Sequence, residues 1–289
     1  MLWVNLDYTV ADARRWLTTR AQIDPVMVSA LTDADPRPRA VAHGEDLMLI
    51  VRGINMNEGA APEDMVSIRA WIEPRRIITL RHRHSHVLHT LADLLDSNAG
   101  PRVPGDFTPL LVERIVDVVV RRVDTLGDRI AECEQTVLDE ASADLRTTLA
   151  DLRRRAISLR RFLAPQREAL AKLTATAVPW LDATQRARIA ESADDMTRTI
   201  EELDAARDRA AVTQEELGTR VAEATNQRLY VLSLITAIFL PLGFVCSLLG
   251  VNVGGVPLQK DDWAFWALCA VFAIGVAIQL WLFRKRGWL

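Results

Sequence analysis

Apolar residues are spread unevenly along the chain. Two uncharged apolar runs stand near its C-terminal end, from Leu229 to Val251 and from Trp263 to Phe283. As helices that rise ~1.5 Å per residue, they would extend about 35 Å and 31 Å, and each would cross a hydrocarbon core roughly 30 Å thick. The pattern predicts two membrane-spanning helices, with the tripeptide Gly250-Val251-Asn252 at the end of the first.

The first 105 residues show shorter and mixed patterns. β-branched and alternating segments predict strands, and segments with apolar residues three or four apart predict helices. The expected strands are 2–6, 47–54, 65–72 and 76–80, and the expected helices are 11–20, 25–31 and 86–95. We therefore expect an α/β domain over residues 1–105. Asn98–Pro109, with three prolines and two glycines, reads as a linker at its end.

Beyond the linker, the pattern is almost entirely helical. Two long amphipathic helices are expected over Leu110–Glu140 and Asp144–Thr174. A third begins near Asp182 and meets no proline before Pro241, so it should run for about 60 residues into the first apolar run. The predicted fold is an α+β domain (1–105), a helical domain with a long stalk helix (106–228) and a domain of two transmembrane helices (229–289).

Charges beside the apolar runs predict the orientation in the membrane. Arg220 and Arg228 precede the first run, and three basic residues, 284–286, follow the second. The segment 252–262 between the runs has one lysine and two aspartates. By the positive-inside rule, both termini and the large N-terminal part are cytoplasmic.

A net charge of −3 gives no indication of nucleic-acid binding. No nucleophile–base pair or phosphate-binding loop stands at a usable spacing, so we do not expect an enzyme.

The long third helix has a polar face that continues into the membrane. Steps of seven residues connect four carboxylates, Asp194, Glu201, Asp208 and Glu215, and then Ala222, Leu229, Thr236, Gly243 and Gly250. A companion stripe contains Asn226, Ser233, Leu240 and Ser247. If several copies surround an axis, the membrane part lines a pore and the carboxylates line a cytoplasmic vestibule that concentrates cations. The alternative is that small residues only allow close helix packing, and that the carboxylates form a solvated surface.

The chemistry of this face bears on the form of the transported ion. In the membrane it offers amide and hydroxyl oxygens and lacks carboxylates and histidines. Removing the water shell of a divalent cation would require anionic oxygens, or nitrogen and sulfur in the case of zinc. We therefore expect an ion that passes while at least partly hydrated.

The residues around the first apolar run resemble the CorA family of divalent-cation transporters. The resemblance rests on Asn226, Arg228, Tyr230, the stretch 238–242 (IFLPL) and Gly250-Val251-Asn252, with basic residues after the second run. It implies a homopentameric funnel in a bacterial inner membrane, whose first span lines the pore. Asn252 would form a ring at the outer mouth, Gly250 would allow the turn that presents it, and Asn226 would form a ring at the cytoplasmic end. Between them, the resemblance places Leu229, Thr236, Leu240 and Gly243 along the pore.

Two departures favour one branch of this family. The family signature is Gly-Met-Asn, whereas this chain has Val251 in the middle, and no glutamate follows Pro257 in the loop. With 160–162 (RRF) and 165–167 (PQR), the sequence resembles the ZntB zinc-transporter branch, which implies Zn²⁺ as the transported cation, no cofactor and coupling to a proton gradient. The alternatives are a magnesium, cobalt or nickel channel, and, in another class, a membrane-anchored sensor or scaffold that transports nothing.

Four of the five histidines lie within eight residues. His82, His84 and His86 would share one face of a strand, and imidazole is a preferred ligand of zinc. Arg81 and Arg83 lie between them and would repel a cation. The sequence leaves two readings open, a cytoplasmic zinc site and a solvated basic turn.

Overall fold

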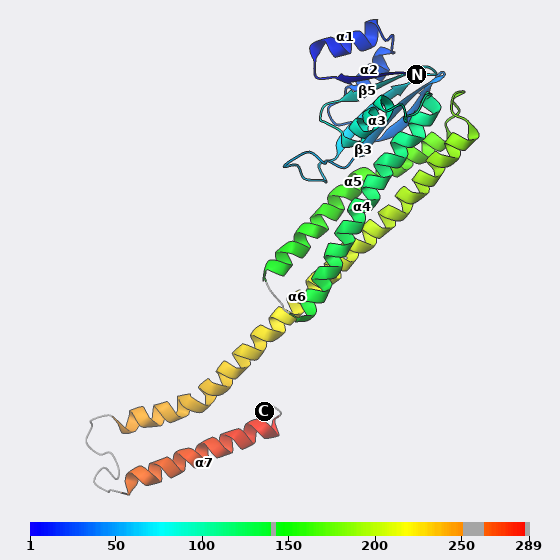
Figure 1. Cartoon of the computed structure of the whole chain (residues 1–289). Helices are drawn as coiled ribbons and strands as arrows, with labels where there is room; N and C mark the ends of the chain where they lie inside the picture. Colours follow the sequence, from blue (N-terminus) through cyan, green and yellow to red (C-terminus); the bar gives the residue numbers. More distant parts are fainter. Residues whose placement is uncertain (140–142, 251–262, 287–289) are drawn as a thin grey trace. The chain divides into compact units, whose positions relative to one another are not determined.

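The computed structural model describes residues 1–139, 143–250 and 263–286. The chain forms two compact units, Met1–Leu217 and Gly218–Leu289. The division falls within one long helix, so each unit is described by itself (Figure 1).

A five-stranded mixed sheet forms the N-terminal part of the first unit (Figure 1). Its strand order is β1-β5-β4-β3-β2, with β1 parallel to β5 and the other neighbours antiparallel. A tight turn with Gly44 at φ +64° joins β2 to β3, and the Glu73 amide donates to the Arg76 carbonyl at the β4–β5 turn. The strands are β1 (Leu2–Asp7), β2 (Arg39–His43), β3 (Asp46–Gly53), β4 (Val66–Ile72) and β5 (Arg76–Arg81).

Both faces of this sheet are buried. On one face, Met48, Ile50 and Trp71 belong to a core formed with α1 (Ala11–Thr19) and α2 (Pro25–Leu31). On the other face, alternate residues of the same strands join a core with α3 (His86–Asp96) and the long helices. Burial on both faces explains why β3 is a continuous apolar run rather than an alternating one.

Three long helices extend this core away from the sheet. They are α4 (Pro104–Asp139), α5 (Ala143–Ala175) and α6 (Ala183–Leu249). Ile130 of α4, Leu159 of α5 and Leu203 of α6 are almost completely buried in one continuous apolar cluster. Arg188 of α6 donates two hydrogen bonds of 2.8 and 2.7 Å to Glu113 of α4 at the edge of this cluster. The sheet and the helices therefore share one core, which makes residues 1–217 a single compact unit.

The linker predicted over Asn98–Pro109 is wrong in its second half, because α4 already begins at Pro104. Proline suits the first position of a helix, and Pro109 costs only one backbone hydrogen bond, to the carbonyl of Gly105. A Cβ on Gly105 would clash with Gln185 Oε1 and lie 2.6 Å from the Trp180 carbonyl, so the start of α4 packs closely against the start of α6. This tertiary packing outweighs the turn-like composition.

Strand β2 was not among the predicted strands. It is a short edge strand that follows Pro36 and Pro38 and consists of Arg-Ala-Val-Ala-His. Two alanines and two flanking prolines give little local preference for a strand. Its register with β3, from Arg39 opposite Ile50 to His43 opposite Asp46, is set by the hairpin turn.

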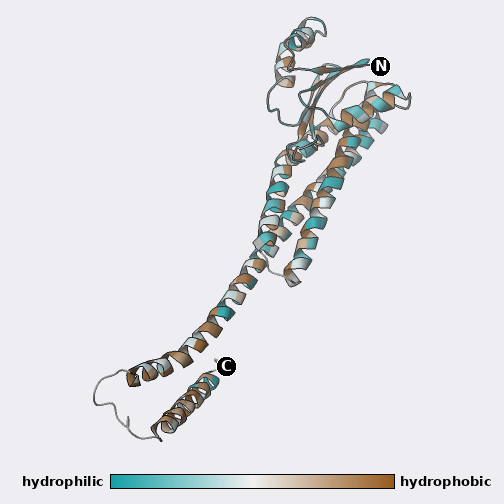
Figure 2. Ribbon diagram, turned by 60° about the vertical axis from the view of Figure 1, so that its left-hand side comes forward, coloured by the Kyte–Doolittle hydropathy of each residue, from teal (hydrophilic) through white to brown (hydrophobic). Residues whose placement is uncertain are grey.

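In the second unit, the described residues are 218–250 and 263–286, which comprise the C-terminal part of α6 and all of α7 (Ala264–Lys285). Both helices have a segment long and apolar enough to cross a membrane. Figure 2 shows the apolar colouring of these segments. Large apolar side chains such as Phe239, Phe244 and Trp266 are about two-thirds exposed or more, at 66%, 67% and 73%. These are the two candidate transmembrane helices that the sequence predicts.

Candidate functional site: the polar face of the long helix

The first-unit part of α6 has one buried face and one exposed face. The five residues Met196, Ile200, Leu203, Ala210 and Leu217 are buried in the core of the first unit. They recur at spacings of three, four or seven residues, which places them along one side of an α-helix. The core thereby determines which side of α6 remains exposed.

The four carboxylates of the predicted vestibule lie on the exposed side. Asp194, Glu201, Asp208 and Glu215 are all exposed, and Arg207 Nη2 lies 2.8 Å from Asp208 Oδ1. This hydrogen bond and ion pair raise the pKa of Arg207. The carboxylates thus form an acidic row at heptad spacing, and their role in a vestibule remains a prediction.

The membrane part of α6 continues the same spacing. Residues of the two predicted stripes alternate at steps of three and four, which is the spacing of residues that face a common axis in a bundle of helices. All of them are exposed in the chain, and none is covered by α7. They are Asn226, Leu229, Ser233, Thr236, Leu240, Gly243, Ser247 and Gly250.

A different face of α6 is directed toward α7. Leu234, Ala237, Ile238, Leu242 and Val245 are half-buried and recur at helical spacing. In α7 the half-buried residues are Ala264, Ala267, Leu268, Phe272, Val276, Gln279 and Phe283. A hydrogen bond from Gln279 to Ala237 joins the two faces. Because α7 occupies this face, the polar stripe of α6 stays free for contact with water, ions or other copies of the helix.

Thr236 presents an acceptor on the stripe. Its hydroxyl donates to the Leu232 carbonyl at 2.8 Å, one turn earlier in the helix. The donor is therefore used by the backbone, and the oxygen lone pairs remain available on the exposed side. Such an oxygen can accept a hydrogen bond from the water shell of a cation.

Gln279 and Pro241 form a feature that the sequence reading did not predict. Pro241 lies inside α6 and has no backbone N–H, so the carbonyl of Ala237, four residues earlier, lacks its helical partner. Gln279 Nε2 of α7 donates to this carbonyl at 2.6 Å. The sequence could have predicted this interaction. Gln279 is the only amide side chain in the second apolar run, and Pro241 marks the Ala237 carbonyl as one without a helical partner.

Two residues of the predicted outer mouth lie outside the described residues. Val251 and Asn252 both follow the last described residue of this segment, Gly250. The Gly250 amide donates to the Cys246 carbonyl at 3.0 Å and closes the last turn of α6. The outer ring remains a prediction that rests on the resemblance to the CorA family.

The structure does not gather His82, His84 and His86 into a metal site. Strand β5 ends at Arg81 and α3 begins at His86, so the alternation that would align the three side chains is absent. His82 packs against Tyr8 at 6.0 Å between ring centroids, and His84 packs against His89 at 5.4 Å. Within the described ranges, no three His, Cys, Asp or Glu side chains are grouped to hold a metal ion.

Comparison with known proteins identifies the family. A family model described as CorA-like Mg²⁺ transporter protein matches residues 1–285. The divalent cation transporter CmaX of Pseudomonas aeruginosa is 35% identical over 290 residues, which cover 100% of this chain and 87% of CmaX. The zinc transport protein ZntB of Yersinia enterocolitica is 32% identical and covers 99% of this chain and 88% of its own length.

Solved structures agree with this result. The structure of full-length CmaX has a TM-score of 0.82 at 35% identity and covers 98% of this chain and 87% of that one. The CorA magnesium transporter from Methanocaldococcus jannaschii also has a TM-score of 0.82, covering 99% of this chain and 91% of that one. At 17% identity, the latter similarity concerns the fold alone.

Proposed function

Because the chain belongs to the CorA family of divalent metal-cation transporters, we propose that it is a zinc transporter whose pore is lined by α6 of a homo-oligomer. The observation that carries this proposal is the stripe of small and polar residues on α6, which is exposed while α7 occupies another face. A face of this kind needs a partner other than lipid, because hydroxyl and amide groups are costly to expose to hydrocarbon. Further copies of α6 around a hydrated axis would supply it.

In this proposal, the ion meets a sequence of environments along α6. Asn252 forms the outer ring, the hydroxyls of Ser247, Thr236 and Ser233 contact the water shell, and Asn226 lies at the cytoplasmic end. Leu229 and Leu240 form apolar constrictions. The exposed carboxylates from Glu215 back to Asp194 then raise the local concentration of cations. The chain is a homopentamer in a bacterial inner membrane, with both termini in the cytoplasm.

Zinc is favoured by two observations. The ZntB relatives, named for zinc transport, are 31–32% identical over nearly the whole chain. Val251 also replaces the methionine of the magnesium-type signature. The second candidate is Mg²⁺ transport, because the matching family model is described as a Mg²⁺ transporter.

Flux into reconstituted vesicles tests the choice of ion. Purified protein is reconstituted, and uptake of Zn²⁺, Mg²⁺ and Co²⁺ is followed with internal fluorescent indicators, with and without a pH gradient. We expect Zn²⁺ uptake that a pH gradient accelerates. Mg²⁺ uptake without Zn²⁺ uptake would exclude zinc transport and support the second candidate. Zn²⁺ uptake at the same rate with and without a pH gradient would exclude proton coupling.

Two glycines provide a matched test of the pathway. A Cβ added at Gly243 on the stripe or at Gly275 on α7 meets no atom of the described chain within 4 Å, so neither position excludes a larger side chain within one copy. Gly243→Leu should abolish flux, because several leucines would meet at the axis, whereas Gly275→Leu should retain it. Asn252→Ala should also reduce flux. Equal flux in both glycine variants would exclude α6 as the pore lining.

A further inference from the structure

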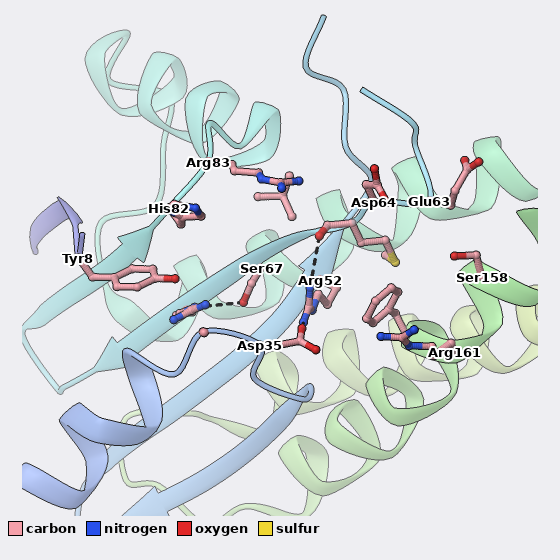
Figure 3. A pocket seen from close by; sticks show the side chains of 15 residues that line it. Tyr8, Asp35, Arg52, Glu63, Asp64, Ser67, His82, Arg83, Ser158 and Arg161 are labelled. Carbon is pink, nitrogen blue, oxygen red and sulfur yellow. Dashed lines mark hydrogen bonds and ion pairs between the residues drawn. The ribbon is translucent and has the colours of Figure 1, made fainter. Parts of the chain in front are cut away.

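The first unit contains a cavity of about 370 Å³ that is distant in sequence from the polar stripe of α6 (Figure 3). Its walls come from strands β3 and β4 and the segment before β4, from the residues that follow β1, α2 and β5, and from α5. The volume lies within the range of small-molecule sites, roughly 300–1,000 Å³. Four arginines line it: Arg52, Arg69, Arg83 and Arg161.

Arg52 is buried in the wall and is held in a fixed orientation. Only 8% of its surface is exposed, and its guanidinium lies 4.6 Å from the centroid of the Phe162 ring. Its Nη2 forms an ion pair with Asp35 and also donates to the Pro36 carbonyl at 3.0 Å. Its Nε is buried and has no hydrogen-bond partner in the described chain. A buried N–H without a partner is costly, so this side chain retains an unused capacity to bind an acceptor.

Arg69 is buried still more deeply. It is 2% exposed, donates from Nη1 to the Leu31 carbonyl at 2.8 Å and from Nε to Ser67 at 3.2 Å, and lies over the Tyr8 ring at 4.3 Å. Burial lowers the pKa of Arg69. No carboxylate forms an ion pair with it within the ranges that the structure describes. The charge therefore lacks a close anionic partner in the chain.

The remaining charges leave the cavity positive. Three carboxylates line it, of which Asp35 is paired with Arg52, and Glu63 lies 3.6 Å from Arg155, outside the lining. Asp64 is the third. Arg83 and Arg161 are exposed and form no ion pair with described residues, although Arg161 stacks on Phe162. Positive charge is thus in excess where buried and exposed guanidinium groups surround the same space (Figure 3).

We propose that this cavity binds a small phosphate-bearing anion, with Arg52 and Arg69 in the wall and Arg83 and Arg161 at its opening. Guanidinium groups are planar donors whose fork matches phosphate oxygens, and they bind them more strongly than they bind neutral acceptors. The rings of Tyr8 and Phe162 hold the guanidinium planes in place before a ligand arrives. The anion would connect the sheet to α5, because Arg52 and Arg69 are on strands and Arg161 is on α5.

Calorimetric titration of the full-length protein in detergent tests this site. Inorganic phosphate, pyrophosphate and ATP are titrated at about 150 mM salt, where loose surface attraction is largely screened. We expect at least one of them to bind with one site per chain. Binding of pyrophosphate or ATP but not of inorganic phosphate would identify a ligand with several phosphates. Binding of inorganic phosphate alone would identify the ligand as the simple ion. Absence of binding by all three would overturn the proposal.

The exposed arginines allow a variant test that does not depend on buried residues. Arg83→Gln and Arg161→Gln should each weaken binding about tenfold or more, because each removes a charge-assisted contact. Arg153→Gln is the matched control, since Arg153 is an exposed residue of the same helix as Arg161 and does not line the cavity. An equal loss in the Arg153 variant would show nonspecific attraction and overturn the site. Binding is measured without ion flux, so the result is independent of the proposed transport.

Discussion

The two units of this chain obtain their stability from different surroundings. In the first unit, apolar residues of the sheet and of three long helices are buried in cores within one chain. In the second, α7 has no buried residue within its described length, and the candidate span of α6 is likewise 0% buried. One helix, α6, takes part in both arrangements.

This difference shows how a single helix can change its environment without a break. Up to Leu217, the apolar face of α6 is buried and the carboxylates are exposed. From Leu229 onward, apolar residues occur all around the helix, and only a narrow stripe is small or polar. A helix that is apolar nearly all round is typical of a membrane span or of a deeply buried core, whereas an amphipathic one packs its apolar face on a protein core and leaves the other face to water. Four predictions test this contrast.

The largest effect should come from separating the units. A fragment of residues 1–217 should remain in solution without detergent, because its apolar residues are already buried within the unit. The full chain should sediment under the same conditions, because its membrane helices expose apolar surface. Ultracentrifugation and circular dichroism measure both. Aggregation of the fragment would show that the first unit depends on the second or on further copies.

Leucine-to-alanine substitutions at two positions of α6 compare the environments directly. Leu203 is 0% exposed, and Leu203→Ala should destabilise the protein by about 2–5 kcal/mol, the usual cost of a cavity in a core. Leu232 is 59% exposed, and Leu232→Ala should change the stability by less than about 0.5 kcal/mol. Thermal unfolding of the full chain in detergent gives both values. Similar losses would mean that the surroundings of the two positions are alike.

A smaller effect is expected at the hydrogen bond between α7 and α6. Gln279→Leu should lower the free energy of unfolding by about 1 kcal/mol, in line with hydrogen bonds between membrane helices. Pro241→Ala restores an N–H that can bond to the Ala237 carbonyl, so Gln279→Leu should cost less in that background. A double-mutant cycle from unfolding in sodium dodecyl sulfate measures the coupling. If the effects of Gln279→Leu and Pro241→Ala on the free energy of unfolding simply add, Gln279 does not replace the hydrogen bond that Pro241 removes.

The smallest effect concerns pH. Burial, and then the nearby Glu73, raise the pKa of Asp46. A raised pKa in the folded state means that this group favours folding at low pH and loses that contribution as the pH rises through its folded pKa. Asp46→Asn should therefore raise the melting temperature slightly at pH 7, and the gain should disappear below about pH 4, where an unfolded aspartate is also protonated.

An exposed acid provides the control for this measurement. Glu58 is exposed and forms no ion pair within the described ranges, so Glu58→Gln should leave the melting temperature unchanged at either pH. The described parts of the two spans, 229–250 and 264–283, contain no aspartate, glutamate or histidine. A pH dependence that persists in Asp46→Asn would therefore come from titratable groups outside these two spans.

The sequence predicts long, periodic elements well because their signal is summed over many residues. The helices from Asp144 and Asp182 and the strands around Leu49 and Ile68 lie within one or two residues of their expected bounds. The start of α4 and the edge strand β2 could not be predicted in this way. Packing of Gly105 against Gln185, and pairing of β2 with β3, are interactions between distant residues that override local composition.

The candidate sites also differ in whether regular spacing along the chain or contacts between distant residues bring their members together. The polar stripe of α6 could be predicted because all its members lie on one helix at a regular spacing. The arginine-lined cavity could not, since its arginines come from separate parts of the chain and have no common spacing: Arg52, Arg69, Arg83 and Arg161. The histidines show the opposite case, because residues close in sequence lie against different rings where β5 ends and α3 begins, His82 against Tyr8 and His84 against His89.

The bond from Gln279 to Ala237 also has a consequence for biosynthesis. A nascent α6 that enters the bilayer before α7 exposes the Ala237 carbonyl to hydrocarbon, where no water can replace the missing partner, at a cost of several kcal/mol. That cost is removed only when the 22-residue α7 has been synthesised and inserted beside it. The two helices should therefore leave the translocon as a pair, with Gln279 setting the depth at which the second stops relative to the first.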